Sequence, residues 1–206
     1  MATLAYPHIF EPGSDPTAPP LLLLHGTGGD ERDLLPLGRQ LSPGSALLSP
    51  RGDVIEHGAR RFFARIAEGV FDPAEVTRRT HALADFVAAA AAQHGFDRGR
   101  LIAVGFSNGA NIAATLLQLR PESLAGAVLL RAMVVLDRPA AAGTLTGKRV
   151  LLANGTHDPI VSNDHPPRLA TLLRAGGATV ALHTSPSGHG LVAADLVAAQ
   201  DFLAIG

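Results

Sequence analysis

The sequence predicts an α/β fold built on a mostly parallel sheet with helices on both faces. Three observations lead to this prediction. Apolar runs of strand length, such as Leu21–Leu24, alternate along the chain with segments of helical composition. These runs are continuous rather than alternating apolar and polar, which is typical of strands buried on both faces. Polar side chains capable of chemistry follow several runs directly, where open parallel sheets bind their ligands.

Composition limits the classes of function. The 206 residues suffice for a single domain over 1–206, and 47% hydrophobic with 17% charged residues is a globular composition. A net charge of −1 favours neither nucleic acid nor an anionic membrane. The absence of cysteine excludes disulfides, thiolate nucleophiles and cysteine-bound metals. No signal-peptide pattern opens the chain, and no apolar run reaches the length of a membrane span. We therefore expect a cytoplasmic protein.

The first half of the chain predicts two strands and two helices. A stretch rich in proline and glycine, 12–20, predicts a turn before the buried strand Leu21–Leu24. A short helix over Glu31–Leu41 follows, and then a strand over Ala46–Ser49 that a proline stops. The second helix is expected over residues 73–94. It has an aspartate N-cap, proline at the first helical position, glutamate at the third, and a glycine after its end.

The second half continues the alternation of strands and helices. In chain order the predicted elements are a strand at Leu101–Val104, a helix at Ala110–Leu119, strands at Ala127–Leu130 and Val150–Ala153, a helix that is capped by Asn163 or Asp164 and reaches Ala175, a strand at Thr179–Leu182 and a closing helix at Gly190–Leu203.

The most specific motif lies where the strand at Leu101–Val104 meets the following helix. Residues 105–109 are Gly-Phe-Ser-Asn-Gly, a Gly-x-Ser-x-Gly pentapeptide. A serine on a sharp strand-to-helix turn is a nucleophile elbow, and small residues on either side avoid collisions with neighbouring backbone. The elbow predicts that the Ser107 hydroxyl is exposed. It also predicts that the backbone N–H of Asn108 faces a developing oxyanion at a helix N-terminus.

An acid and a base follow later strands in the order of an α/β-hydrolase triad. Asp158 lies in a tight turn after Val150–Ala153, and His189 lies after the last strand. Serine needs a base to remove its proton, and an aspartate can hold the imidazole tautomer. Asp137, which also follows an apolar stretch, is the rival acid. His183 is interpreted as structural.

A phosphate-binding loop and a metal site are two further interpretations of the polar clusters, and both are disfavoured. The loop His25–Asp30 is rich in glycine, but it lacks the Lys-Ser/Thr of a P-loop and the third glycine of a dinucleotide fingerprint. We interpret it instead as the source of a second oxyanion donor, the backbone N–H of Thr27. His157, Asp158, Asp164 and His165 could suggest a metal site, but adjacent prolines and loose spacing argue against one.

With these motifs the chain resembles the phospholipase/carboxylesterase family of small α/β-hydrolases, in particular its bacterial branch of hydroquinone-resistance (MhqD-like) hydrolases. The matching pieces are LLLLHGTGGDERDLLPLGRQL, LLSPRGDVIEHGARRFFARIAEGVFD, VGFSNGANIAATLL, LLANGTHDPIV and GHGL. The resemblance implies the α/β-hydrolase fold, carboxylester hydrolysis and often a homodimer. It implies Ser107, Asp158 and His189 as the triad, with Thr27 and Asn108 as oxyanion donors.

The predicted core fold uses nearly all of the chain, which leaves no room for a large lid. We therefore expect an open cleft that accepts small, short-acyl esters. The residues expected around it are Arg51, Arg61, Phe62, Phe63, Phe71 and Met133. For the phenylalanines, core packing is an equally good interpretation. The arginines of residues 51–65 could form salt bridges to Asp53, Glu56 and Glu68, or Arg51 or Arg61 could bind a carboxylate on an acidic ester.

The sequence thus predicts a serine esterase that needs no metal or organic cofactor. A thioesterase or acyltransferase using the same triad is the main alternative. A catalytically inactive ligand-binding protein of the same fold is a further alternative, which the intact triad disfavours.

Overall fold

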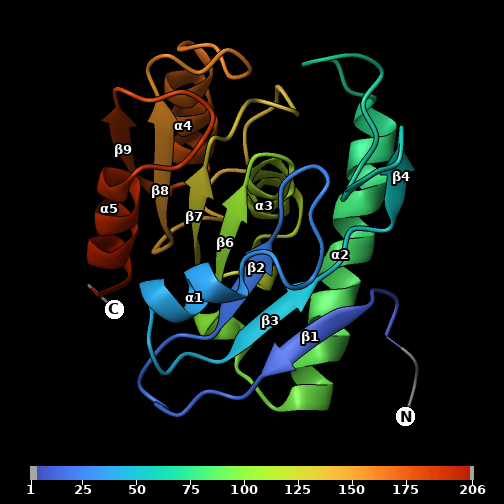
Figure 1. Ribbon diagram of the computed structural model, residues 1–206, viewed down its shortest axis with the longest axis vertical. Coiled ribbons are helices and arrows are strands. Elements are labelled where there is room, and N and C mark those ends of the chain that lie inside the picture. Colours follow the sequence, from blue (N-terminus) through green and yellow to red (C-terminus); the bar gives the residue numbers. More distant parts are fainter. Residues whose placement is uncertain (1–3, 205–206) are drawn as a thin grey trace.

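The computed structural model describes residues 4–204, and its centre is a seven-stranded sheet in the order β1-β3-β2-β6-β7-β8-β9 (Figure 1). Every neighbouring pair is parallel except β1 and β3, so the predicted mostly parallel α/β sheet is confirmed. The strands of this sheet are β1 (His8–Glu11), β2 (Leu21–Leu24), β3 (Leu47–Pro50), β6 (Ile102–Phe106), β7 (Gly126–Leu130), β8 (Arg149–Gly155) and β9 (Thr179–Ser185).

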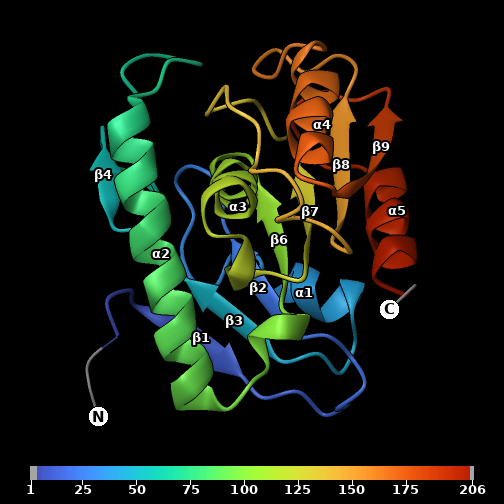
Figure 2. The same cartoon turned by 180° about the vertical axis from the view of Figure 1, so that it is seen from behind.

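Helices cover both faces of the sheet, as Figures 1 and 2 show from opposite sides. The helices are α1 (Leu35–Leu41), α2 (Pro73–His94), α3 (Asn108–Leu119), α4 (His165–Ala175) and α5 (Ala193–Ala204). Two short 3-10 turns, η1 (Arg98–Arg100) and η2 (Pro121–Ser123), join α2 to β6 and α3 to β7. One hydrophobic cluster contains α2, α3 and α4, and the other contains α1 and α5.

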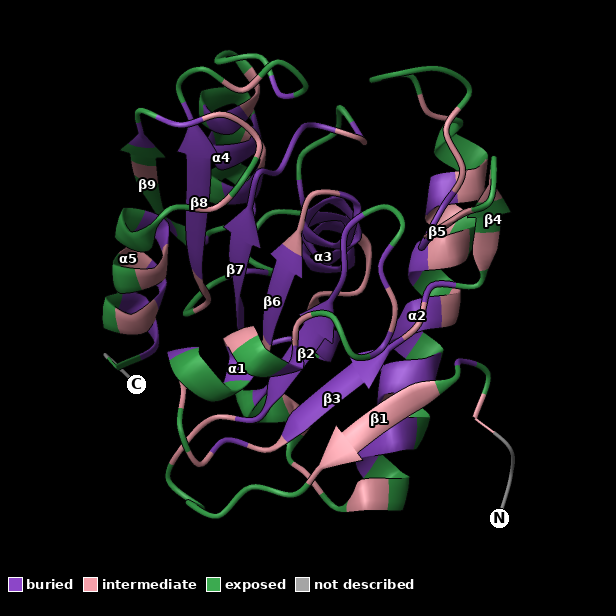
Figure 3. Ribbon diagram, in the orientation of Figure 1, coloured by how far each residue is buried: buried purple, intermediate pink, exposed green. Residues whose placement is uncertain are grey.

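The strands divide their side chains between these two clusters. In β2, Leu22 and Leu24 belong to the cluster of α2, α3 and α4, whereas Leu21 and Leu23 belong to that of α1 and α5. All four leucines are 0% exposed. Figure 3 shows the same burial along the central strands. Burial on both faces explains why these strands are continuous apolar runs in the sequence.

The predicted ends of α2 are confirmed. The Asp72 carboxylate accepts a hydrogen bond from the N–H of Ala74 at 2.9 Å, and Gly95 closes the helix with φ 76°. Two other predicted helix starts are wrong. α1 begins at Leu35 rather than Glu31, because Asp30 caps a turn at Arg32 and Pro36 fits only in the first turn of a helix. α5 begins at Ala193 rather than Gly190, because the carbonyl of Gly190 is bound elsewhere.

The edge strand β1 and a separate hairpin were not predicted from the sequence. β1 is short, half-buried and partly polar, so it lacks the continuous apolar run of the inner strands. The hairpin pairs β4 (Val54–Glu56) with β5 (Ala59–Arg61). Its turn residues His57 and Gly58 both have positive φ, as a two-residue type I′ turn requires.

In the part of the chain that the structure describes, no helix combines the length and hydrophobicity needed to cross a bilayer.

Candidate active site

Ser107 lies on the sharp turn between β6 and α3. Its backbone has φ 53°, a left-handed conformation that is unusual for a residue with a side chain. The flanking glycines are required by close packing. A Cβ on Gly105 would lie 2.5 Å from the carbonyl oxygen of Gly109, and a Cβ on Gly109 would lie 1.9 Å from that of Leu24. The turn therefore has the geometry of a nucleophile elbow.

The side chains of Ser107, His189 and Asp158 form one hydrogen-bonded line. Nε2 of His189 lies 2.9 Å from Oγ of Ser107, and Nδ1 of His189 lies 2.8 Å from Oδ2 of Asp158. These residues come from three strand ends, those of β6, β9 and β8. A carboxylate at Nδ1 leaves Nε2 free to accept the serine proton, so the line can activate a hydroxyl.

The Asp158 carboxylate is held in its charged form. Its side chain is fully buried, and its Oδ1 accepts hydrogen bonds from the N–H groups of Ile160 at 2.8 Å and Val161 at 3.1 Å. Burial by itself raises the pKa of Asp158, but these hydrogen bonds and the imidazole of His189 outweigh it and lower the pKa below its usual range. The rival Asp137 lies exposed on the surface, where it pairs with Arg168 at 3.0 Å.

Two backbone N–H groups are available near Ser107. Asn108 is the first residue of α3, so its N–H has no partner within the helix. Within residues 4–204, the N–H of Thr27 donates no backbone hydrogen bond. Both residues line the same cavity as Ser107. The arrangement suits a negatively charged oxygen that would form beside Ser107.

The side chain of His25 braces the Thr27 loop. Its Nε2 accepts a hydrogen bond from the N–H of Gly52 at 2.9 Å, so its Nδ1 carries the proton that faces the carbonyl of Gly26 at 2.7 Å. Burial lowers the pKa of His25, which keeps the ring neutral. Nη1 of Arg61 donates to the hydroxyl of Thr27 at 2.6 Å and fixes the loop from the other side.

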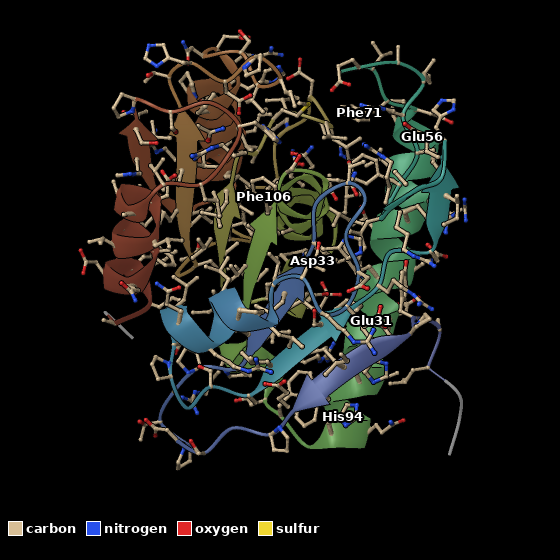
Figure 4. All side chains as sticks on the ribbon, in the orientation of Figure 1. Glu31, Asp33, Glu56, Phe71, His94 and Phe106 are labelled. Atoms are coloured by element: carbon tan, nitrogen blue, oxygen red, sulfur yellow. The ribbon has the colours of Figure 1, made fainter. Side chains whose placement is uncertain are left out.

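The cavity beside Ser107 has a volume of about 280 Å³. Five of the pocket and oxyanion residues expected from the sequence line it: Thr27, Arg61, Phe71, Asn108 and Met133. Ser107 and His189 line it as well. In Figure 4, Phe106 lies near the upper end of β6 and Phe71 near the upper end of α2, and both residues belong to the cavity wall.

Three expected pocket residues lie elsewhere. Phe62 and Phe63 are 0% exposed and belong to the core cluster, because they follow β5 where the chain turns inward onto α2 and α3. The N–H of Phe62 also donates to the side-chain oxygen of Asn108 at 2.7 Å. Arg51 does not line the cavity, and its guanidinium lies 3.5 Å from the Glu31 carboxylate.

Sequence reasoning missed five residues that line the cavity: Arg65, Glu68, Phe106, Asn111 and Ile160. For two of these residues, the position relative to Ser107 in the sequence indicates a place near the site. Phe106 occupies the variable position before the elbow serine, and its ring centroid lies 5.3 Å from that of His189. Asn111 lies one helical turn after Ser107, on the same side of α3. Its side-chain oxygen accepts a hydrogen bond from the N–H of Met133 at 2.9 Å.

The arginines of the cavity wall are paired with protein groups. Arg65 pairs with both Glu56 and Glu68. Arg61 is 4% exposed, donates to the carbonyl of Phe63 at 3.1 Å and lies 3.6 Å from Glu56. Burial lowers the pKa of Arg61. The salt-bridge interpretation is therefore confirmed for Glu56 and Glu68, whereas Asp53 pairs with Arg79 instead.

Three of the four residues considered as a metal cluster have separate protein partners. Asp158 belongs to the hydrogen-bonded line, Asp164 pairs with Arg168, and the ring of His165 accepts from the N–H of Val134. Among residues 4–204, no group of three or more histidine, aspartate or glutamate side chains is arranged to hold a metal ion.

Comparison with known proteins identifies the family to which the chain belongs. The model of the phospholipase/carboxylesterase family matches residues 66–206. The chain belongs to this family. It is 45% identical to the MhqD protein of Bacillus subtilis (strain 168) over 184 residues, which cover 89% of this chain and 90% of that protein.

Solved structures of carboxylesterases share the fold. The Bacillus cereus carboxylesterase superposes with a TM-score of 0.92 at 43% identity, covering 96% of this chain and 92% of that one. A carboxylesterase from Mesorhizobium loti superposes with a TM-score of 0.83 at 37% identity, covering 89% and 87%. The α/β-hydrolase fold expected from the sequence is thereby confirmed, and the chain is a member of a hydrolase family.

Proposed function

We propose that this protein is a serine carboxylesterase that hydrolyses small carboxylic esters through an acyl-enzyme on Ser107. The observation that carries the proposal is the hydrogen-bonded line from Ser107 through His189 to Asp158, with distances of 2.9 and 2.8 Å. Membership of the phospholipase/carboxylesterase family supports it. The proposed chemistry uses no metal or organic cofactor, since side chains and backbone supply every group.

In the first half of the reaction, the Ser107 hydroxyl attacks the ester carbonyl while Nε2 of His189 takes its proton. The carbonyl oxygen becomes an oxyanion, which accepts hydrogen bonds from the N–H groups of Thr27 and Asn108. The bond to the alcohol oxygen then breaks, and the alcohol leaves with the proton from His189. Asp158 stabilises the imidazolium that exists between these two proton transfers.

In the second half, a water molecule attacks the acyl-enzyme, and His189 takes one of its protons. The same two N–H groups stabilise the second oxyanion. The bond from the carbonyl carbon to Ser107 breaks, and Oγ recovers the proton from His189. The products are one carboxylic acid and one alcohol, and the enzyme returns to its starting state.

The dimensions of the cavity support short acyl groups. Its volume of about 280 Å³ lies just below the range of about 300–1,000 Å³ that is typical of small-molecule sites. Phe71, Phe106 and Met133 supply apolar contacts on its wall. We expect kcat/KM to peak at short acyl chains and to fall toward palmitate in a series of p-nitrophenyl esters. A steady rise toward palmitate would contradict the short-acyl preference but not the acyl-enzyme mechanism.

The central test replaces the nucleophile. Ser107→Ala should lower kcat for p-nitrophenyl acetate by about 10⁶ and abolish labelling by a fluorophosphonate probe. The melting temperature should stay near the wild-type value, because alanine is smaller than serine. Wild-type turnover by a folded Ser107→Ala variant would refute the acyl-enzyme proposal. Thioester and added-alcohol substrates, assayed in parallel, would reveal a preference for thioester hydrolysis or acyl transfer.

A homodimer and a cytoplasmic location remain predictions. Light scattering on the purified protein tests the first, and fractionation of the source cells tests the second.

A further inference from the structure

Arg131 follows β7 directly and has no role in the proposed reaction. Its side chain is 0% exposed, which is rare for an arginine. A buried guanidinium is costly unless its N–H groups are bonded and its charge is paired. Its backbone also has an unfavourable left-handed conformation, with φ 60°. Residues of this kind persist only where the surrounding structure holds them, and they cluster at functional sites.

Arg131 and Ser107 occupy equivalent places on neighbouring strands. β6 and β7 lie side by side in the sheet (Figure 1), and Phe106, the last residue of β6, pairs in register with Leu130, the last residue of β7. The N–H of Ser107 donates to the carbonyl of Leu130 at 2.9 Å, and that of Arg131 donates to the carbonyl of Ala153 at 2.8 Å. Both residues have positive φ, so each strand is followed directly by a residue in an unfavourable backbone conformation.

The guanidinium of Arg131 binds the backbone on both sides of His189. Its Nε donates to the carbonyl of Gly188 at 3.2 Å, and its Nη2 donates to the carbonyl of Gly190 at 2.7 Å. Its Nη1 donates to the carbonyl of Ala153 at 3.1 Å, within β8. One rigid side chain therefore connects the His189 loop to the strand that leads to Asp158.

Asp195 pairs with this guanidinium in the first turn of α5. Its side chain is also 0% exposed, and its Oδ2 accepts from Nη2 of Arg131 at 2.5 Å and from the N–H of Val192 at 3.0 Å. Its Oδ1 accepts from the hydroxyl of Ser185 at 3.0 Å. Nη2 of Arg131 also donates to the hydroxyl of Ser187 at 3.0 Å. The pair thereby joins the end of β9, the His189 loop and α5.

Fold stability alone does not account for this pair. Well-packed apolar residues of similar volume often replace buried ion pairs without loss of stability. Apolar residues cannot, however, hold the two carbonyls that flank His189. A lysine cannot do so in the same way, because the planar fork of arginine directs several N–H groups at once.

We propose that Arg131 is a positioning residue that fixes the backbone of residues 188–190 and thereby holds the His189 imidazole between Ser107 and Asp158. This inference rests on the proposed function of Ser107, His189 and Asp158. Small displacements of a catalytic group can lower a rate by about 100-fold, so removing this support should lower kcat strongly. It should leave KM nearly unchanged, since Arg131 does not line the substrate cavity.

The first test compares Arg131→Lys with Lys148→Met as a control. Lys148 donates to the carbonyl of Leu124 at 2.6 Å, at the amino ends of β7 and β8. We expect Arg131→Lys to lower kcat for p-nitrophenyl acetate by about 10- to 100-fold with KM within about twofold. Lys148→Met should lower the melting temperature but keep the wild-type kcat. A folded Arg131→Lys variant with wild-type kcat would overturn the proposal.

The second test removes the charge pair without leaving one partner buried alone. The double variant Arg131→Met/Asp195→Leu keeps similar side-chain volumes, so it should fold even where a single variant does not. We expect it to retain a cooperative thermal transition and to lose about 100-fold in kcat. Wild-type kcat in this folded double variant would show that Arg131 serves stability only.

A third measurement does not depend on activity. The low-field NMR resonance of the His189 Nδ1 proton, assigned by its absence in His189→Gln, reports the hydrogen bond to Asp158. It should broaden or disappear in Arg131→Lys and persist in Lys148→Met. An unchanged resonance in Arg131→Lys would refute the positioning role. Failure of the proposed function can be distinguished from failure of this inference. It would appear as wild-type activity in Ser107→Ala, while the resonance would still change in Arg131→Lys.

Discussion

The two sides of the candidate site are held together by different kinds of interaction. On the side of the base, Arg131 and Asp195 are both 0% exposed, and their polar groups bind protein partners around the His189 loop. On the side of the cavity mouth, residues 54–71 contain one nearly buried pair, Arg61 with Glu56, and one pair nearer to solvent, Arg65 with Glu68. Arg65 is 29% exposed there, and its partner Glu68 is 62% exposed.

This difference affects how firmly each side is positioned. Removing one partner of a buried ion pair costs about 3–5 kcal/mol, because the other charge is left without compensation. An exposed pair contributes about 0–1 kcal/mol and is screened by salt. We therefore expect the geometry around His189 to depend more strongly on its ion pair than the part of the mouth around Arg65 and Glu68 does. We expect changes on the side of His189 to affect the chemical step and changes at the mouth to affect substrate range, and four predictions test that separation.

The largest expected effect lies within the hydrogen-bonded line. Asp158→Asn should lower kcat by about 10⁴, because an amide can hold His189 in the wrong tautomer. Asp137→Asn is the matched control, since Asp137 pairs with Arg168 on the surface. Steady-state hydrolysis of p-nitrophenyl acetate measures both. The opposite ranking would place the acid after the stretch that ends at Leu136.

The next prediction compares the two kinds of ion pair directly. Asp195→Ala should lower the free energy of unfolding by about 3–5 kcal/mol, because Arg131 would remain buried without its carboxylate. Glu68→Ala should lower it by less than about 1 kcal/mol. Urea unfolding followed by circular dichroism gives both values. Similar losses in the two variants would remove the distinction between the two sides.

A smaller effect is expected at the contact between the mouth and the oxyanion loop. Arg61→Gln removes the hydrogen bond to Thr27, and a bond to a charged group is worth about 1.5–3 kcal/mol. We expect kcat/KM to fall by about tenfold for a neutral methyl ester and equally for its ω-carboxylate analogue. Arg51→Gln is the control, because Arg51 does not line the cavity. A selective rise in KM for the acidic ester would instead show that Arg61 binds a substrate carboxylate.

The smallest effect is a pH dependence of stability. Burial lowers the pKa of His25 in the folded protein. Below about pH 6.5, the ordinary pKa of histidine, the unfolded chain therefore binds a proton at this residue more readily than the folded protein does. The contribution of His25 to stability is complete above about pH 6.5 and declines as the pH falls. The slope from one group is at most about 1.4 kcal/mol per pH unit.

Urea unfolding between pH 8 and pH 5 tests this prediction. His94 contributes with the same sign, because burial and the neighbouring His8 lower its pKa as well. His25→Asn and His94→Gln should therefore each remove part of the slope. An undiminished slope in His25→Asn would mean that the buried ring of the oxyanion loop does not titrate in this range.

Much of the site could be predicted from the sequence, for a topological reason. Parallel strands present their carboxyl ends at one edge of the sheet, so polar residues after β6, β8 and β9 meet there whatever the details of packing. That rule placed Ser107, Asp158 and His189 together, and the structure joins them by two hydrogen bonds. The elbow could be predicted for a local reason, because only glycine fits at positions 105 and 109.

Tertiary structure alone decided the remaining features. Phe62, Phe63 and Phe71 belong to one irregular segment without strand or helix periodicity, so the sequence cannot distinguish the first two, which enter the core, from the third, which lines the cavity. The role of Arg131 could not be predicted from the sequence either, because a single charged residue in an apolar stretch can equally well lie on the surface. Its partners come from residues 153, 187–190 and 195, and only the folded sheet brings those distant backbone groups around one buried guanidinium.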